Sequence, residues 1–200
     1  ILKIIDNKGP LRAEIFDLHF IQEFCISNDI QQIQTKSSSN VVFQTKEPVI
    51  FDETTQETVP PLDNKDFNFR IGYNKETVKT NEDPEVVSFI VNKTARIYRY
   101  INRISYTHKD YPVRVDFSIV KTKAVTNNKT IQECDLFNAP ENYEIEIEVL
   151  NERISEFKPD ELYPKIQSVL MIILRGIQNT LYPIKKSEAD KILIQYSDMM

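Results

Sequence analysis

Tryptophan is absent from this chain of 200 residues, and glycine occurs at only three positions. Dinucleotide-binding and P-loop folds cradle phosphate groups with closely spaced glycines. Because the chain has no glycine-rich segment of that kind, we expect neither fold. Tyrosine and phenylalanine, with nine and eleven residues, must supply the aromatic bulk of the core.

Cysteine and histidine are also scarce, with two of each. Cys25 and Cys134 are far apart and lack the spacing of a zinc site, so we expect reduced thiols in a cytosolic-type compartment. His19 and His108 form no cluster that would indicate a metal site. The sequence also lacks a secretory pattern, an apolar run long enough to span a bilayer, and any Ser-His-Asp or Cys-His pattern.

The net charge of −5 disfavours a protein that coats nucleic acid without specificity, although a local basic surface remains compatible with it. The length suits one domain with some helical additions. Because the chain begins at Ile1 rather than at a methionine, we expect it to be a fragment of a longer protein.

Alternation of apolar and polar residues predicts a series of strands. The expected strands lie within residues 1–16 around a turn at 7–10, and at 41–46, 67–76, 96–106, 113–121 and 143–149. Helical spacing predicts a helix over 18–27 capped by Asp17, an amphipathic helix over 160–182, and a last helix capped by Ser187. The segments 52–65 and 124–140 are expected to be polar and irregular.

The strand at 143–149 reads Tyr-Glu-Ile-Glu-Ile-Glu-Val, and it is unusual. Strand side chains alternate between faces, so Glu144, Glu146 and Glu148 share one face. Carboxylates in a row repel one another and cannot face an apolar core. Either water screens them or a cation binds them.

Other strands also have one apolar and one charged face. Arg99 and Arg103 alternate with tyrosines, and Arg114 and Asp116 alternate with valine and phenylalanine. A half-buried sheet with a wet outer surface explains this pattern strand by strand. The alternative is a closed antiparallel barrel with a polar interior, whose apolar outer wall packs against the N- and C-terminal helices. Sorting of the acidic and basic residues onto different strands favours the barrel, and we therefore expect an α+β protein of that kind.

A barrel interior with sorted charges has a chemical use. Carboxylates on one side hold a hard divalent cation, and guanidinium groups on facing strands hold phosphate oxygens. The cation then bridges carboxylate and phosphate. The expected ligand is a polyphosphate; the alternative is an internal lattice of salt bridges without a ligand.

Taken in order, the strands of Asp66–Glu76, Arg99–Arg103, Arg114–Lys121 and Tyr143–Val149 resemble the RNA 5′-triphosphatase domain of mRNA-capping enzymes from large DNA viruses and fungi. That family belongs to the triphosphate tunnel metalloenzymes. The resemblance covers residues 11–151. It implies a tunnel-forming β domain over 1–158, followed by helices over 159–200 that pack on the barrel or lead to a following domain.

The resemblance also implies an activity, metal-dependent removal of the γ-phosphate of nascent mRNA, with Mg²⁺ or Mn²⁺ as cofactor. It implies metal binding by Glu144, Glu146 and Glu148, and catalytic roles for Asp116, Arg99, Arg114 and Glu76. Substrate binding would fall to Arg12, Lys46, Arg70, Arg99, Arg103, Arg114 and Lys121. The expected partners are triphosphate-ended RNA and the guanylyltransferase and methyltransferase domains of the same polypeptide or complex, in the cytoplasm, in a viral factory or in a virion.

The sequence departs from the family pattern in several places. The family's first Glu-x-Glu strand is missing, Glu14 stands alone, and we expect the motif upstream of Ile1. Ile101 stands where the family has a lysine. Lys121 has the apolar parity of its strand, so that reaching the tunnel would require a β-bulge. No Lys-x-Asp-Gly motif for nucleotidyl transfer is present.

These departures leave other functions open. One alternative is a tunnel enzyme that hydrolyses a nucleoside or inorganic triphosphate. Another is a non-catalytic domain that binds RNA ends or serves as a scaffold, which the missing motif and Ile101 favour.

Overall fold

The computed structural model describes residues 1–7, 9–52, 54–91, 95–125 and 130–199. The chain divides into two compact units. Unit 1 contains Ile1–Thr58, Asn74–Ile104 and Asp116–Ile145. Unit 2 contains Val59–Tyr73, Ser105–Val115 and Glu146–Met200.

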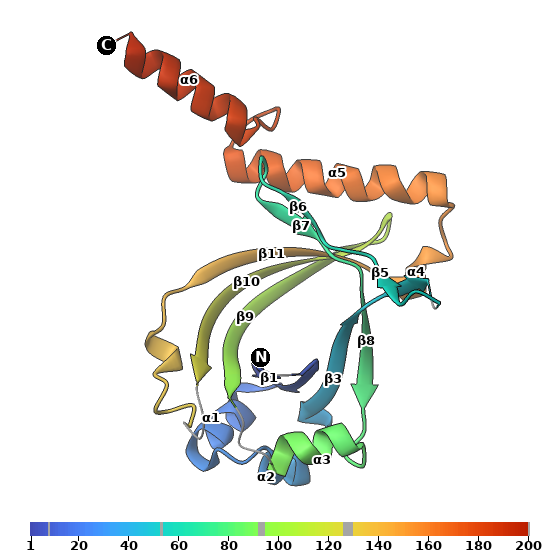
Figure 1. Ribbon diagram of the computed structural model, residues 1–200, viewed down its shortest axis with the longest axis vertical. Helices are drawn as coiled ribbons and strands as arrows, with labels where there is room; N and C mark the ends of the chain where they lie inside the picture. The colour runs from blue at the N-terminus through green and yellow to red at the C-terminus, as the bar shows by residue number, and fades with distance from the viewer. Residues whose placement is uncertain (8, 53, 92–94, 126–129, 200) are drawn as a thin grey trace. The chain divides into compact units, whose positions relative to one another are not determined.

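Strands and helices occur in separate runs along the chain, in an α+β arrangement (Figure 1). The strands are β1 (Leu2–Asp6), β2 (Leu11–Ile15), β3 (Val41–Pro48), β4 (Ile50–Asp52), β5 (Glu57–Thr58), β6 (Leu62–Asn64), β7 (Phe69–Ile71), β8 (Asn74–Lys79), β9 (Arg96–His108), β10 (Tyr111–Val125) and β11 (Asn142–Val149). The helices are α1 (Leu18–Ser27), α2 (Ile30–Lys36), α3 (Pro84–Val91), α4 (Asn151–Ile154), α5 (Pro159–Gln178) and α6 (Lys186–Asp198), with short 3-10 helices η1 (Ser38–Asn40) and η2 (Leu136–Asn138).

The main sheet has seven strands in the order β11-β10-β9-β1-β2-β3-β8. It curls strongly, as a half-barrel (Figure 1). The predicted closed barrel is wrong for the described part of the chain, because β11 and β8 are the two edges of this sheet and are not hydrogen-bonded to each other. Closure requires every strand to have two neighbours, and the edge strands have one each.

The strand register sorts the side chains of β1, β2, β3, β8 and β9 onto two faces. Lys3 is paired with Arg99 on one side and Glu14 on the other, and Lys46 with Glu76. We call this charged side the inner face. On the opposite side, the outer face, Leu2 is paired with Ile15 and Tyr100, and Ala13 with Phe43.

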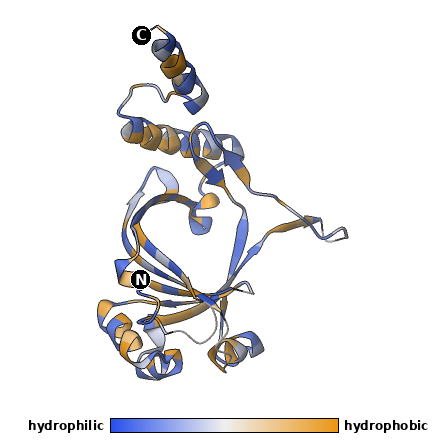
Figure 2. Ribbon diagram, turned by 60° about the vertical axis from the view of Figure 1, so that its left-hand side comes forward, coloured by the Kyte–Doolittle hydropathy of each residue, from blue (hydrophilic) through white to orange (hydrophobic). Residues whose placement is uncertain are grey.

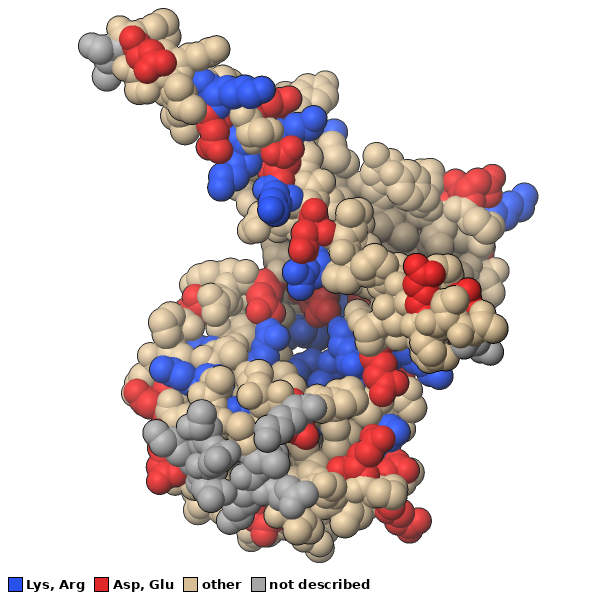
Figure 3. Space-filling model, in the orientation of Figure 1, with Lys and Arg blue, Asp and Glu red and all other residues tan. Residues whose placement is uncertain are grey.

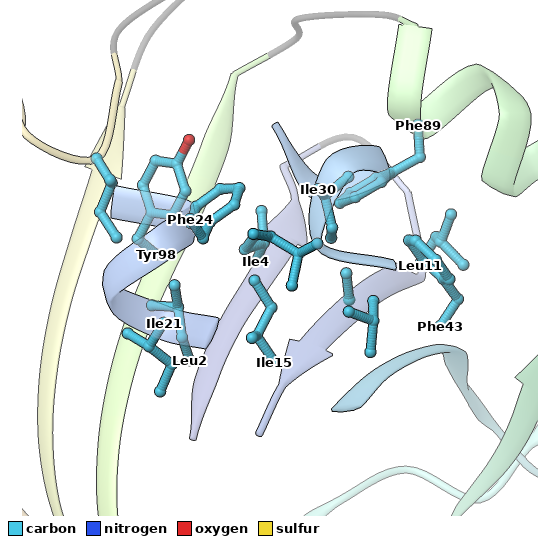
Figure 4. Packing of buried hydrophobic residues seen from close by; sticks show 14 of the residues in the cluster. Leu2, Ile4, Leu11, Ile15, Ile21, Phe24, Ile30, Phe43, Phe89 and Tyr98 are labelled. Carbon is cyan, nitrogen blue, oxygen red and sulfur yellow. The ribbon is translucent and has the colours of Figure 1, made fainter. Parts of the chain in front are cut away.

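The outer face of β1, β2 and β3 carries the hydrophobic core of unit 1. Its side chains pack against apolar residues of α1, α2 and α3 (Figure 4), and apolar and polar positions alternate along the strands (Figure 2). The largest fully buried members include Leu2, Ile4, Ile15, Phe24, Ile33, Phe43 and Val86. Because the helices cover the outer face, the core of unit 1 does not require the inner face to be apolar.

The helix predicted over residues 18–27 is confirmed as α1, and the side chain of Asp17 accepts a hydrogen bond from the His19 amide at 2.8 Å. Helices α2 and α3 were not predicted. Asp29 caps α2 by accepting bonds from Gln31 and Gln32, and Pro84 occupies the first position of α3. Both are ordinary start signals, and the short length of the two helices hid their periodicity.

The strand predicted over 67–76 is wrong. It is divided between β7, which pairs with β6, and β8, which pairs with β3. Asn68 adopts a positive φ of 53° at the turn that joins β6 and β7. Asparagine tolerates this left-handed conformation better than most residues, so the strand begins only after Asn68. Residues 72 and 73, which are not part of a strand, separate β7 from β8.

In unit 2, the two predicted C-terminal helices are confirmed as α5 and α6. The capping role predicted for Ser187 is wrong, because Lys185 is the N-cap residue and the Ser187 amide donates to Asp66 Oδ1 at 3.2 Å. Leu174 of α5 is buried, whereas Leu193 of α6 is 65% exposed, and the expectation that these helices cover an apolar sheet face stays a prediction. Across the described ranges, none of the helices combines the length and apolar character needed to cross a membrane.

Candidate functional site

Glu14 is the centre of the charged network on the inner face. Its side chain is 7% exposed, and its Oε1 atom lies 2.8 Å from Lys3 Nζ and 3.1 Å from Arg12 Nε. Gln44 Nε2 donates to the same oxygen at 2.6 Å. One buried carboxylate therefore joins polar side chains from β1, β2 and β3.

Glu76 joins the network at the edge strand β8. Its carboxylate lies 3.0 Å from Arg12 Nη2 and 3.2 Å from Lys46 Nζ. Partial burial acts to raise the pKa of Glu76, but the charges and hydrogen bonds of Arg12 and Lys46 outweigh it and lower that pKa below its ordinary value. Arg12 thus lies between two carboxylates, Glu14 and Glu76.

A second network lies on β9 and β10. Arg103 Nη1 lies 2.9 Å from Asp116 Oδ2, and Arg103 Nε donates to Ser118 Oγ at 3.1 Å. Asp116 is fully buried, whereas 18% of the Arg103 side chain is exposed. A buried carboxylate is stable in the charged form only with such a partner, so Asp116 and Ser118 fix the direction of the Arg103 guanidinium.

Arg99 links β9 to the glutamate row of β11. Its Nη2 atom donates to both oxygens of Glu144, at 2.7 and 2.8 Å. The glutamate row is exposed, but at Glu144 it contacts a guanidinium group from another strand. Both side chains keep some exposure, 29% for Arg99 and 48% for Glu144.

Some donors on the inner face remain unused. The Nε atoms of Arg12 and Arg99 are buried and donate no hydrogen bond within the part of the chain that the structure describes. Arg12 Nε is close to Glu14 Oε1, but the direction of its N–H does not suit a hydrogen bond. Figure 3 shows blue Lys and Arg atoms close to red Asp and Glu atoms near the middle of the view. Buried unsatisfied donors beside lysines favour an anionic ligand.

Other predicted site residues belong to unit 2. Arg114 forms an ion pair with Glu148. Glu146 lies between Glu144 and Glu148 on β11, with the same strand parity. Arg70 pairs with Asp63 across the β6–β7 hairpin, through Nε at 2.6 Å and Nη2 at 3.0 Å. Arg70 is thus held by an exposed partner within its own hairpin.

Lys121 and Ile101 differ from the other expected tunnel positions. Lys121 Nζ donates to the carbonyl of Phe137 at 2.7 Å and lies 3.6 Å from Glu141. Its neighbour Val120 is fully buried, whereas Phe117 and Ile119, which share the parity of Lys121, are 42% and 37% exposed. Ile101 is 3% exposed and offers no phosphate contact. Lys121 is therefore engaged with the segment around η2 rather than with the arginines.

The structure offers carboxylate ligands of the right chemistry for the metal that the resemblance implies, but in the described part of the chain too few of them lie together to complete its coordination. Among the residues described, no group of three or more His, Cys, Asp or Glu side chains is arranged to hold a metal ion. Glu144 offers carboxylate oxygens, the ligands that Mg²⁺ and Mn²⁺ prefer, but it is paired with Arg99. Mg²⁺ commonly uses one or two carboxylates together with water and substrate phosphates. The glutamates of β11 fit this role only if a phosphate supplies further oxygens.

Sequence reasoning missed several polar residues of the inner face: Lys3, Glu14, Gln44 and Ser118. Strand parity was the available signal. Lys3 lies between Leu2 and Ile4, and Glu14 lies between Ala13 and Ile15. The four apolar neighbours are fully buried on the outer face, whereas Lys3 and Glu14 lie on the inner face. A polar residue flanked by buried ones at strand spacing belongs to the opposite face.

Comparisons of the chain with protein-family models, with curated proteins and with solved structures found no match.

Proposed function

We propose that this chain is a metal-dependent RNA 5′-triphosphatase domain, which removes the γ-phosphate of nascent mRNA during cap formation. The observation that carries the proposal is the contact of Arg99 with Glu144. It joins a carboxylate row to guanidinium groups on the inner face of a curled sheet. Such a face has both the cations that bind phosphates and the carboxylates that bind a divalent metal.

In this proposal the arginines bind and orient the triphosphate. Arg99 is held by Glu144, and Arg103 by Asp116 and Ser118, so both guanidinium groups have fixed directions before a ligand arrives. Fixed donors stabilise charge that develops on phosphate oxygens without reorganising during the reaction. Asp116 therefore orients Arg103 rather than contacting the substrate.

The basic residues of the neighbouring strands extend the same face. Glu76 holds Arg12 and Lys46, which would contact phosphates farther along the chain of phosphoryl groups. The role of Arg114 and of Glu148 rests on the resemblance, because these residues form their pair in unit 2. The roles of Arg70 and Lys121 rest on the resemblance as well, and their present contacts do not favour them.

The glutamates of β11, Glu144 and Glu146 with Glu148, would hold Mg²⁺ or Mn²⁺. When bound, such a cation polarises the γ-phosphoryl group and neutralises the charge on its oxygens. Arg99 must then exchange part of its contact with Glu144 for a phosphate oxygen.

The direct test is release of phosphate from triphosphate-ended RNA with Mg²⁺ or Mn²⁺, for the full-length protein that contains this domain. We expect metal-dependent release that Glu144→Ala and Glu146→Ala abolish. Glu141→Ala is the matched control, because Glu141 precedes β11 and contacts Lys121 instead of an inner-face arginine. Turnover that persists in both variants contradicts the assignment.

A non-catalytic domain that binds triphosphate-ended RNA is the second candidate. It is favoured by one observation, the absence of a group of three metal-ligating side chains among the described residues. Tight binding of triphosphate-ended RNA without phosphate release, at any concentration of either metal, would favour it. Faster hydrolysis of free nucleoside or inorganic triphosphate than of RNA would instead favour the small-molecule tunnel enzyme.

The partners and location belong to the same proposal. Guanylyltransferase and methyltransferase domains in the same polypeptide or complex would take the diphosphate end that this reaction produces. A cytoplasmic site, in a viral factory or virion, follows only from the resemblance. Co-purification of guanylyltransferase activity with the full-length protein tests the first of these statements.

A further inference from the structure

We infer that Lys3 contacts the anionic ligand and that Glu14 is a positioning residue, which fixes Lys3 and Arg12 and weakens the binding of that anion. The inference rests on the proposed function and deepens it. Neither residue carries one of the roles that the resemblance implies. Their own contacts on the inner face assign the roles.

Geometry supports the positioning role of Glu14. Lys3, Arg12 and Gln44 all approach the same oxygen, Oε1, at 2.8, 3.1 and 2.6 Å. These side chains come from three adjacent strands, whose register places Lys3 directly opposite Glu14 and Arg12 opposite Gln44. A long, flexible lysine is thereby held in one direction, which reduces the entropy lost when a ligand binds.

Lys3 is placed to reach a ligand held by Arg99. The register pairs Lys3 with Arg99 on β9, and both side chains lie on the inner face. Lys3 retains 15% exposure and Arg99 retains 29%, so neither is sealed from a ligand. Lys3 has an interaction with one carboxylate, whereas an ammonium group can donate three hydrogen bonds.

Glu14 also opposes the anion that it helps to orient. It is a buried negative charge beside the cations that would bind phosphate. Like charges at short distance in a partly buried site repel strongly, because solvent screens them poorly. The carboxylate should therefore lower the affinity for a polyphosphate while improving the geometry in which it is bound.

The opposing effects give Glu14 a signature that a purely structural residue lacks. We measure the affinity for inorganic tripolyphosphate, without metal, by titration calorimetry of the full-length protein. Removing one partly buried charge beside the cations that would hold the ligand changes affinity about tenfold or more. Glu14→Gln should therefore bind about tenfold more tightly, and Lys3→Gln about tenfold more weakly.

Turnover should change in the opposite sense. Because Lys3 and Arg12 lose their orienting partner, we expect kcat of Glu14→Gln for triphosphate-ended RNA to fall about tenfold. KM should fall as well. Glu23→Gln is the matched control, because Glu23 forms a comparable pair with Lys36 at 2.8 Å but lies on α1. It should leave affinity and kcat unchanged.

Each outcome decides the inference. Affinity of Glu14→Gln that equals or falls below that of Glu23→Gln overturns it, as does tighter binding with an unchanged kcat. Unchanged affinity in Lys3→Gln overturns the role of Lys3. If Glu14→Gln does not fold, Lys3→Gln/Glu14→Gln replaces it, and this double variant must bind more tightly than Lys3→Gln.

The proposed function fails separately from this inference. A wild-type protein that neither binds tripolyphosphate nor releases phosphate from RNA contradicts both. A wild-type protein that does both, with variants at Glu14 that behave like the control, contradicts only the inference drawn from Glu14.

Discussion

The two faces of strands β1, β2 and β3 use alternate residues of the same short segments for opposite purposes. On the outer face, Leu2, Ile4 and Ala13 are fully buried against the core. On the inner face, Lys3 and Arg12 keep 15% and 12% of their side chains exposed within a network of ion pairs. Outer-face burial supplies the free energy of folding, and it leaves the inner face to maintain charges at close range.

This division explains how the sheet tolerates so many charges. Burial of apolar surface contributes about 25 cal/mol per Å², whereas buried ion pairs add little net stability because of desolvation. The charges of the inner face therefore add little to the stability of the fold, and we expect them to serve ligand binding. If so, substitutions on the outer face should change stability, and those on the inner face should change anion binding.

The largest effect should come from the outer face. Phe43 is 1% exposed and its ring lies against Phe89 at 6.1 Å, so Phe43→Ala should lower the free energy of unfolding by about 4 kcal/mol. Urea denaturation measures this. The matched control is Phe51→Ala, because Phe51 is 63% exposed. Equal destabilisation by the two substitutions would remove the distinction between the faces.

A smaller loss of stability should follow from Asp116→Asn, the most buried charge of the inner face. The substitution leaves Arg103 with a neutral acceptor, and we expect a loss of about 2 kcal/mol, reduced by the partial exposure of Arg103. Asp63→Asn, which affects the exposed partner of Arg70, should leave stability nearly unchanged. A similar effect of both would show that Asp116 is not held as the geometry indicates.

A smaller difference is expected between substitutions of Lys46 and of Lys121 in their effect on the affinity for an anion. Lys46→Gln should weaken binding of inorganic tripolyphosphate about fivefold, because Lys46 lies on the inner face beside Glu76. Lys121→Gln should have little effect, since Lys121 is engaged with Phe137 and Glu141. The comparison is made by calorimetry, and the reverse order of effects would place the anion elsewhere.

The smallest effect concerns acid stability. The pKa of Glu76 is lowered in the folded protein from its ordinary value of 4.5. Its ion pairs therefore stabilise the protein fully at pH values above 4.5, and this contribution is lost as the pH falls through the lowered pKa. Glu76→Gln should therefore be slightly less stable at neutral pH. It should also show a shallower decline on acidification below about pH 4.5. Parallel pH profiles of unfolding for the two proteins would contradict the assignment.

Local patterns in the sequence predicted the longer strands of the main sheet and three helices, α1, α5 and α6. The limits of α1 agree with the residues expected, and the β9–β10 hairpin turns at Lys109 and Asp110, between the strands expected at 96–106 and 113–121. Parity also placed Arg99 and Arg103 together opposite Tyr98 and Tyr100. These features depend on side-chain alternation and capping, which are local properties.

Properties that depend on distant parts of the chain could not be predicted in the same way. Closure of the sheet depends on whether its edge strands find partners, and no periodicity records that. The charged network around Glu14 depends on the register of three strands, so a single glutamate in the sequence gave no sign of its three partners. What α5 and α6 cover stays a prediction for the same reason, because an apolar stripe does not determine the surface that it packs against.

The central claim is that the inner face binds a chain of phosphates. It is tested most directly by NMR of the arginine Nε–H groups during titration with inorganic tripolyphosphate. The unused Nε donors of Arg12 and Arg99 should shift, whereas that of Arg70, which donates to Asp63, should not. Shifts confined to Arg70, or no shift at Arg12 and Arg99 at saturation, would contradict the account.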